Sequence, residues 1–124
     1  MTEVVLSVAS NAPNRRQMVD RALEWLTGVI APLRTSFAYT TPALHGQSTY
    51  LNVVATGYCA FSLPRLQSML KDYERAAGRT PEVRATHLVP IDVDVVMWEG
   101  EILKPKDFHQ EFFQKGWQDL QRAE

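Results

Sequence analysis

Two aspartates stand two residues apart in the run Ile91-Asp92-Val93-Asp94-Val95. On a β-strand, side chains two apart point to the same side, so both carboxylates share one face. Two carboxylates held side by side repel each other unless a cation lies between them. Hard oxygen ligands of this kind suit Mg²⁺, which binds one or two carboxylates together with substrate phosphates. The spacing therefore indicates a site for magnesium and phosphate, with a solvated strand face as the alternative.

Cationic side chains near the aspartates are candidates for holding phosphates. No glycine spacing in the chain matches a Walker loop or a dinucleotide-binding fingerprint, so a glycine-rich backbone cradle is not expected. Arg79 and Arg84 precede the aspartate pair, and Lys115 follows it. For each of these three cations the alternative is an ordinary solvated surface charge.

A second pair with strand spacing consists of Tyr50 and Asn52, which also share a face. Asparagine offers a donor and an acceptor to an amide-like ring edge, and tyrosine offers a flat surface for stacking. This pair suits a planar heterocycle, with an ordinary strand surface as the alternative. A zinc site is not expected, because metal-ligand spacing is absent among the histidines, which are His45, His87 and His109.

Bulk composition narrows the functional classes. The chain has 124 residues, 45% hydrophobic and 22% charged, which fits one globular domain over residues 1–124. The net charge is -1, from 13 basic and 14 acidic side chains. Proteins that bind nucleic acid or anionic membranes normally carry a basic excess, so we expect neither partner here. The charge balance does not determine the oligomeric state.

Location is inferred from the cysteine content and from the hydrophobic segments. Cys59 is the one cysteine, which excludes an intrachain disulfide and fits a reducing compartment. The longest stretch without Asp, Glu, Lys or Arg, residues 35–64, is interrupted by proline, glycine and polar residues. It therefore cannot cross a bilayer as a helix, and the short apolar run at residues 4–9 is no signal peptide. We expect a cytoplasmic protein.

The periodicity of hydrophobic residues predicts an α+β fold. Strands are expected at residues 4–9, 35–40, 50–61 and 91–98. Helices are expected from a cap at Asn14 to residue 30, and from a cap at Ser62 to residue 77, which Gly78 ends. Residues 42–49 and 79–90 are predicted as loops, and the segment after residue 98 as a short mixed tail. The order β-α-β-β-α-β is the ferredoxin-like arrangement, an antiparallel sheet with both helices on one face.

Six short motifs, in order along nearly the whole chain, resemble those of 6-hydroxymethyl-7,8-dihydropterin pyrophosphokinases. They are Ala9-Ser10-Asn11, Tyr39-Thr40-Thr41-Pro42, Tyr50-Leu51-Asn52, Glu74-Arg75-Ala76-Ala77-Gly78-Arg79, Asp92-Val93-Asp94, and His109 with Lys115-Gly116-Trp117. The resemblance implies transfer of diphosphate from ATP to the hydroxymethyl group of the dihydropterin in folate biosynthesis, with release of AMP. The implied partners are these two small molecules.

The resemblance also implies roles for matching residues. Asp92 and Asp94 are expected to hold two Mg²⁺ ions and, with Arg79 and Arg84, to form the catalytic group. The pterin is expected to stack between Tyr50 and Trp117. The other expected pterin contacts are Asn52, Thr41, Pro42 and Leu44. The expected nucleotide contacts are Glu74, Arg79, Arg84, His109 and Lys115.

One stretch departs from the family pattern. Family members carry Trp-Gly-Pro-Arg shortly before the aspartates, whereas residues 86–89 here read Thr-His-Leu-Val. We expect Arg84 to replace the missing phosphate clamp, and Lys115 to substitute a point charge for a forked arginine. Two alternatives follow. One is a catalytically weak relative that binds pterin or nucleotide as a sensor, and the other is a ferredoxin-like protein-interaction module, favoured by the few residues after Trp117.

Overall fold

The computed structural model describes residues 1–43 and 48–122. Within these residues six strands form one antiparallel sheet in the order β2-β4-β1-β5-β6, with β3 also pairing with β4. The strands are β1 (Thr2–Ser10), β2 (Arg34–Thr35), β3 (Tyr39–Pro42), β4 (Thr49–Cys59), β5 (Asp92–Trp98) and β6 (Glu101–Ile102). The helices are α1 (Arg15–Leu26), α2 (Leu63–Ala76), α3 (Pro81–Arg84), α4 (Pro105–Phe108) and α5 (Glu111–Arg122).

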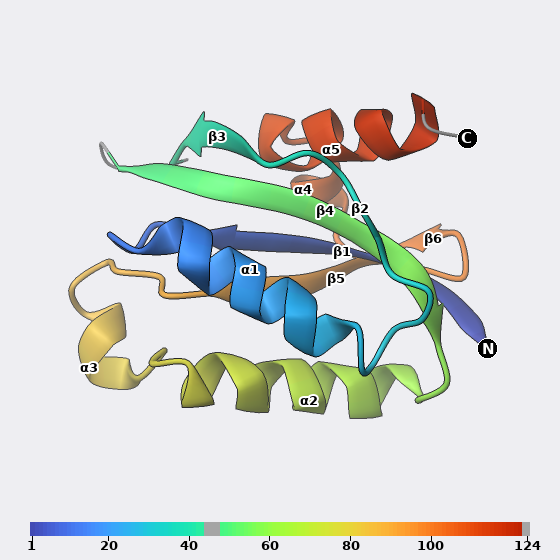
Figure 1. Cartoon of the computed structure of the whole chain (residues 1–124), viewed down its shortest axis with the longest axis horizontal. Coiled ribbons are helices and arrows are strands. Elements are labelled where there is room, and N and C mark those ends of the chain that lie inside the picture. Colours follow the sequence, from blue (N-terminus) through green and yellow to red (C-terminus); the bar gives the residue numbers. More distant parts are fainter. Residues whose placement is uncertain (44–47, 123–124) are drawn as a thin grey trace.

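One face of the sheet packs against α1 and α2. The alternate residues Leu6 and Val8 of β1, and Val93 and Val95 of β5, are buried in the same cluster as the apolar residues of the two helices. In Figure 1 these helices lie below β4, with β1 and β5 between β4 and α2. The order of the long elements and their antiparallel pairing confirm the predicted ferredoxin-like α+β fold.

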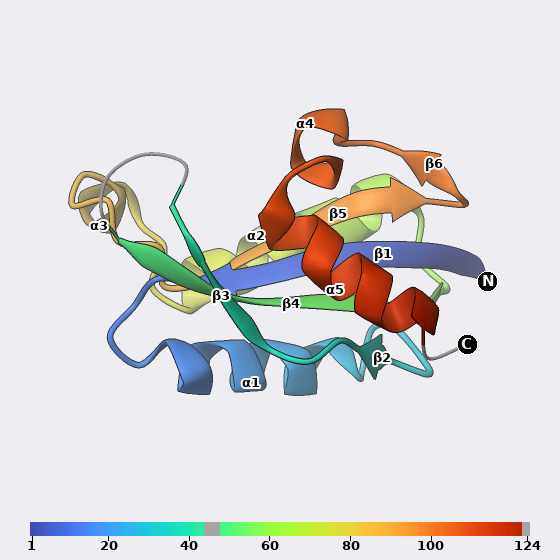
Figure 2. The ribbon, with the colours of Figure 1, turned by 90° about the horizontal axis from the view of Figure 1, so that it is seen from above.

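The opposite face is covered by α5, which lies over β4 when seen from above (Figure 2). Phe113 and Leu120 of α5 are buried against Val54 of β4. The helix approaches so closely that a Cβ at Gly116 would lie 2.5 Å from Cγ2 of Val54. The expectation of a short mixed tail was wrong here, because buried residues recurring at helical spacing make this segment an amphipathic helix.

The predicted strand at residues 35–40 is divided into β2 and β3. At the break, the Ser36 hydroxyl accepts a hydrogen bond from the Val54 amide at 3.0 Å, which replaces a backbone ladder bond. The loop predicted at residues 79–90 contains the short helix α3, capped by the Thr80 hydroxyl. Ser62 caps α2 as expected, whereas Asn14 makes no side-chain cap bond to α1.

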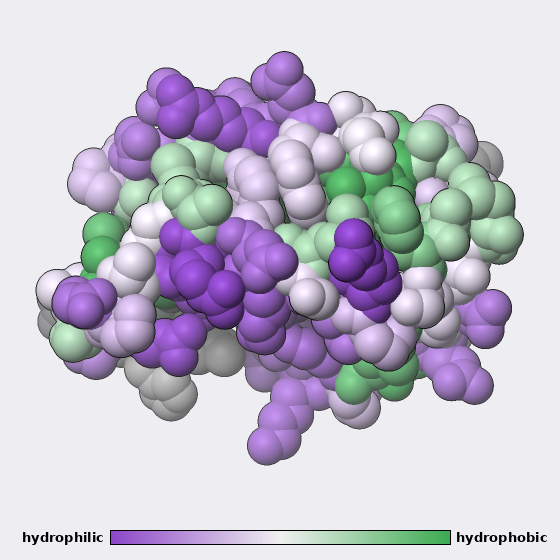
Figure 3. Space-filling view, turned by 90° about the horizontal axis from the view of Figure 1, so that it is seen from below, coloured by the Kyte–Doolittle hydropathy of each residue, from purple (hydrophilic) through white to green (hydrophobic). Residues whose placement is uncertain are grey.

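The surface on the side of α1 and α2 is mixed. Hydrophobic side chains appear there as separate patches among hydrophilic ones (Figure 3). Of the helices within residues 1–43 and 48–122, none has the length and apolar character needed to cross a membrane.

Candidate active site

Residues from three adjacent strands form aligned rows on the face that α5 partly covers. Ala9 of β1 pairs with Asn52 of β4 on one side and with Asp92 of β5 on the other. Two residues farther along the same strand face, Ser7 of β1 pairs with Asp94 of β5. Because the central strand carries only small side chains here, the rows leave space between the carboxylates and the amide.

A cavity of about 830 Å³ lies at this end of the sheet. Figures 1 and 2 show that α3 and the adjoining ends of β3 and β4 lie at the same end of the molecule. One wall of the cavity comes from β3, β4 and the residues beside them. Other lining residues come from the segment before β5, residues 79–89, and from Phe112 after it. Among the lining residues are Ala9, Tyr50, Asn52, Arg79, Asp92 and Phe112.

Asp92 is held by an ion-pair network that starts in α2. Nη1 of Arg79 lies 2.8 Å from Oδ1 of Asp92 and 3.3 Å from Oε1 of Glu74. The other carboxylate oxygen of Glu74 accepts a hydrogen bond from the Val93 amide at 2.7 Å. Glu74 is buried, and both of its carboxylate oxygens are used in these two internal contacts, which hold Arg79 and the start of β5 in place.

Asp94 has a different electrostatic environment. Burial and the nearby Asp92 carboxylate raise the pKa of Asp94 to about 6, against the opposing effect of Lys104. Nζ of Lys104 lies 3.0 Å from Oδ1 of Asp94. Burial, and then the charge of Asp92, also raise the pKa of Tyr50. The charge of Asp92 therefore influences both Asp94 and the Tyr50 hydroxyl.

The amide of Asn52 organises the wall of the cavity formed by β3 and β4. Its Nδ2 donates to Oγ1 of Thr41 at 2.8 Å and to the carbonyl oxygens of Tyr39 and Tyr50 at 3.2 and 3.1 Å. Among the described residues nothing donates to Oδ1 of Asn52, and no fully buried side-chain polar atom lacks a partner. This oxygen is therefore accessible from the cavity as an acceptor with a fixed direction.

The sequence matches the profile of the 7,8-dihydro-6-hydroxymethylpterin-pyrophosphokinase family over residues 5–122. The chain belongs to this family. A curated relative, the mitochondrial folate synthesis bifunctional protein of Arabidopsis thaliana, is 32% identical over 99 residues. That match covers 77% of this chain and 18% of the relative, so the chain spans less than a fifth of the length of this relative. Family membership confirms the resemblance seen in the sequence motifs.

Enzymes of this pyrophosphokinase family use ATP and Mg²⁺. The described residues contain no group of three or more His, Cys, Asp and Glu side chains able to enclose a metal. The donor set is instead two neighbouring carboxylates, Asp92 and Asp94, whose side chains are 33% and 22% exposed. Such a pair fits Mg²⁺, which completes its coordination with water and substrate phosphates.

The structure brings most of the predicted site residues to the cavity. The predicted residues that line it are Thr41, Pro42, Tyr50, Asn52, Arg79, Arg84 and Asp92. Asp94, two residues after Asp92 on the same strand face, is not among the lining residues. Glu74 lies beneath it and reaches it through Arg79. Leu44, a predicted pterin contact, lies outside the described residues.

Three further predicted site residues, all after β6, are not among those that line the cavity. Trp117 packs on Phe113 between α5 and the sheet, with ring centroids 6.2 Å apart. His109 is exposed after α4, and the exposed Lys115 pairs with Glu111 at 3.0 Å.

Sequence reasoning missed Phe112 and Lys104. Phe112 lies in the first turn of α5 and lines the cavity, where its carbonyl accepts a hydrogen bond from the Tyr39 hydroxyl. Burial raises the pKa of Tyr39 to about 12, so this hydroxyl stays protonated as a donor. Lys104 reaches Asp94 because β5 and β6 reverse direction at Glu99. A lysine just beyond a tight turn was the available signal for that pairing.

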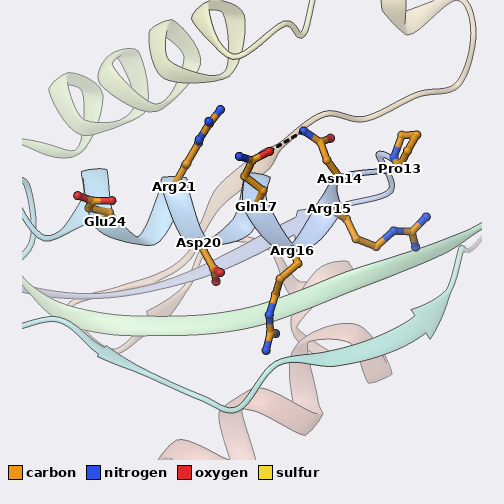
Figure 4. Close-up of a pocket in the computed structure, with 8 residues that line it drawn as sticks. All are labelled: Pro13, Asn14, Arg15, Arg16, Gln17, Asp20, Arg21 and Glu24. Atoms are coloured by element: carbon orange, nitrogen blue, oxygen red, sulfur yellow. Dashed lines mark hydrogen bonds between the residues drawn. The ribbon is translucent and has the colours of Figure 1, made fainter.

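A second hollow, of about 560 Å³, lies along α1 (Figure 4). Its side chains spread away from the helix in different directions, and the hydrogen bond drawn among them joins Asn14 to Gln17 at 3.3 Å. No set of donors converges on one point, so this hollow does not have the character of a ligand site.

Proposed function

We propose that this chain transfers diphosphate from ATP to the hydroxymethyl group of 6-hydroxymethyl-7,8-dihydropterin. The hydroxymethyl oxygen forms a bond to the β-phosphorus, the bond from that phosphorus to the α–β bridging oxygen breaks, AMP leaves, and the hydroxyl proton is released. The supporting observation is one cavity lined both by Asp92 with two arginines and by Asn52 with Tyr50. Asp94 lies next to Asp92 on the same face of β5. Membership of the pyrophosphokinase family supports the same reaction.

The pterin half of the proposed site uses the wall formed by β3 and β4. The amino group and ring N–H of a pterin are donors, and Oδ1 of Asn52 is an acceptor without an internal donor. Tyr50 supplies a ring face beside this acceptor. We place Phe112 rather than Trp117 as the second stacking ring, because Phe112 lines the cavity.

The phosphate half of the proposed site uses the opposite side of the cavity. Asp92 and Asp94 would hold two Mg²⁺ ions, which when bound neutralise charge on the ATP phosphates. Arg79 and Arg84 line the same cavity and would neutralise the remaining phosphate charge. Glu74 keeps Arg79 in place, so this cation needs little reorganisation when substrate arrives. Positioning and charge neutralisation supply most of the rate in phosphoryl transfer.

A test is to incubate the chain with the dihydropterin and Mg-ATP and to measure AMP by chromatography. We expect one AMP for each pterin diphosphate formed, and loss of both products in Asp92→Asn. Binding of both substrates without AMP would favour the sensor alternative. Failure to bind either substrate would contradict both.

A further inference from the structure

Arg15, at the start of α1, uses all three nitrogens of its guanidinium in hydrogen bonds. Nε donates to the Ala12 carbonyl at 3.0 Å and Nη2 donates to the Asn11 carbonyl at 3.1 Å. Nη1 donates to both the carbonyl and the hydroxyl of Thr49, at 2.7 and 2.8 Å. Figure 4 shows this side chain extending toward the ends of β3 and β4, while Arg16 points away from it.

The bond to Thr49 attaches one wall of the cavity. Thr49 is the first residue of β4, pairs with Pro42 at the end of β3, and directly precedes Tyr50. Residues on both sides of this pairing, including Pro42 and Tyr50, line the cavity. Arg15 therefore holds the proposed pterin wall to the segment that follows β1.

Asn11 attaches the opposite wall. Its Nδ2 donates to the His87 carbonyl at 3.0 Å, and its Oδ1 accepts from the Val89 amide at 2.6 Å. The Asn11 amide also donates to the Val89 carbonyl at 3.1 Å. His87 and Val89 line the cavity, and His87 has a left-handed backbone with φ of 64°, which needs such support.

The two walls thus meet at one point, because Arg15 binds the carbonyl of the same Asn11 whose side chain binds residues 87 and 89. We propose that Arg15 is a positioning residue that couples the two walls of the cavity and sets the distance between the pterin and phosphate halves. This inference rests on the proposed function. An arginine suits this position better than a lysine, since a lysine has a single point charge and cannot bond four acceptor atoms on three residues in a fixed fork.

The matched variants are Arg15→Gln, Arg15→Lys and, as control, Arg16→Gln. Arg16 is the exposed neighbour, its replacement removes the same charge, and its side chain makes no hydrogen bond or ion pair with the described residues. Hydrogen–deuterium exchange of the ligand-free proteins measures local opening of each wall. We expect Arg15→Gln to exchange at least about fivefold faster in residues 48–52 and also in residues 86–90, with α2 and the centre of β1 unchanged.

The functional readout is the affinity for 6-hydroxymethyl-7,8-dihydropterin. We expect Arg15→Gln to weaken it about tenfold, Arg15→Lys to show an intermediate loss, and Arg16→Gln to match the parent. Equal exchange in Arg15→Gln and Arg16→Gln would overturn the proposal, and faster exchange in residues 48–52 alone would overturn the coupling through Asn11. If Arg15→Gln is too unstable to measure, the exchange rates of residues 48–52 and 86–90 in Arg15→Lys test the proposal instead. A parent that binds no dihydropterin would refute the proposed function, while the exchange result still decides on Arg15.

Discussion

The Lys104 ammonium lies 3.0 Å from Oδ1 of Asp94, so this proposed metal ligand has a cationic partner of its own, as Asp92 has in Arg79. Lys104 is 44% exposed on its side chain and can move away from this contact. A metal ion that binds Asp94 must therefore compete with the ammonium for the same carboxylate.

Removing this competitor gives a direct prediction. Lys104→Met should bind Mg²⁺ several-fold more tightly than the parent in the absence of nucleotide, because the Asp94 carboxylate then lacks its ammonium partner while Asp92 keeps its contact with Arg79. Calorimetry with Mg²⁺, or spin resonance with Mn²⁺, measures this affinity. Lys106→Met is the control, since Lys106 is an exposed neighbour without an ion pair in the described part of the chain. Equal affinities for all three proteins would exclude competition by Lys104.

The raised pKa of Asp94 predicts how stability depends on pH. The ordinary pKa of an aspartate, which applies to the unfolded chain, is 3.8, and the pKa of Asp94 in the folded protein is about 6. Between these pH values the folded state therefore binds more protons than the unfolded state. Stability should therefore fall as pH rises from about 4 to about 6, and the cost then persists at higher pH. Asp94→Asn removes this cost and should be about 1–3 kcal/mol more stable than the parent at pH 7 but similar to it below pH 4.

Urea unfolding at several pH values measures this difference. Asp20→Asn, on the exposed side of α1, is the control for loss of one negative charge. If Asp94→Asn is no more stable than the parent at pH 7, burial and repulsion at Asp94 are weaker than the structure indicates.

The β-strand alternation was sufficient to place Asp92 and Asp94 on one face and the apolar residues between them in the core. The register with Ala9 was not predictable, because it depends on which strands are neighbours. The pairing with Lys104 had only a weak signal, because it depends on the backbone at Glu99. A turn of two residues with positive φ brings residues after β5 back alongside it, and one sequence alone does not specify that path.

The C-terminal segment shows a different limit. The spacing of the family motif predicted Trp117 as a pterin-stacking residue. Which aromatic ring reaches the cavity depends instead on how the helix α5 is rotated about its axis. Since α5 begins at Glu111, Phe112 lies in its first turn, next to the cavity. Trp117 lies farther toward the C-terminal end of the helix and packs against Phe113. Without recognising that the segment is a helix, this phase could not be assigned.

This difference leads to a prediction about pterin stacking. Phe112→Leu should weaken binding of the dihydropterin by about 1–1.5 kcal/mol, the range for losing an aromatic pair, while keeping an apolar side chain at that position. Trp117→Phe should bind the dihydropterin as the parent does, because Trp117 does not line the cavity. Fluorescence of the pterin ring on titration measures both affinities. Normal binding by Phe112→Leu together with weak binding by Trp117→Phe would reverse this assignment.

Arg84 is the residue on which turnover should depend most. It ends α3, which the Thr80 hydroxyl caps, and it lines the cavity. Arg79 is already tied to Asp92 and Glu74, whereas no side chain in residues 1–43 and 48–122 pairs with the guanidinium of Arg84. Arg84 is therefore available to neutralise phosphate charge as the transition state forms.

Arg84→Ala should lower the rate of AMP release at least about tenfold, since losing one preorganised donor typically costs more than that in turnover. Arg84→Lys should recover part of the rate, because it restores the charge without the fork. Arg75→Ala is the control, as Arg75 is exposed on α2 and pairs only with Asp72 among the described residues. The melting temperature should be unchanged in all three variants, since both arginines are exposed. Should Arg84→Ala release AMP as fast as the parent, another cation, such as Lys104 beside Asp94, must neutralise the phosphates.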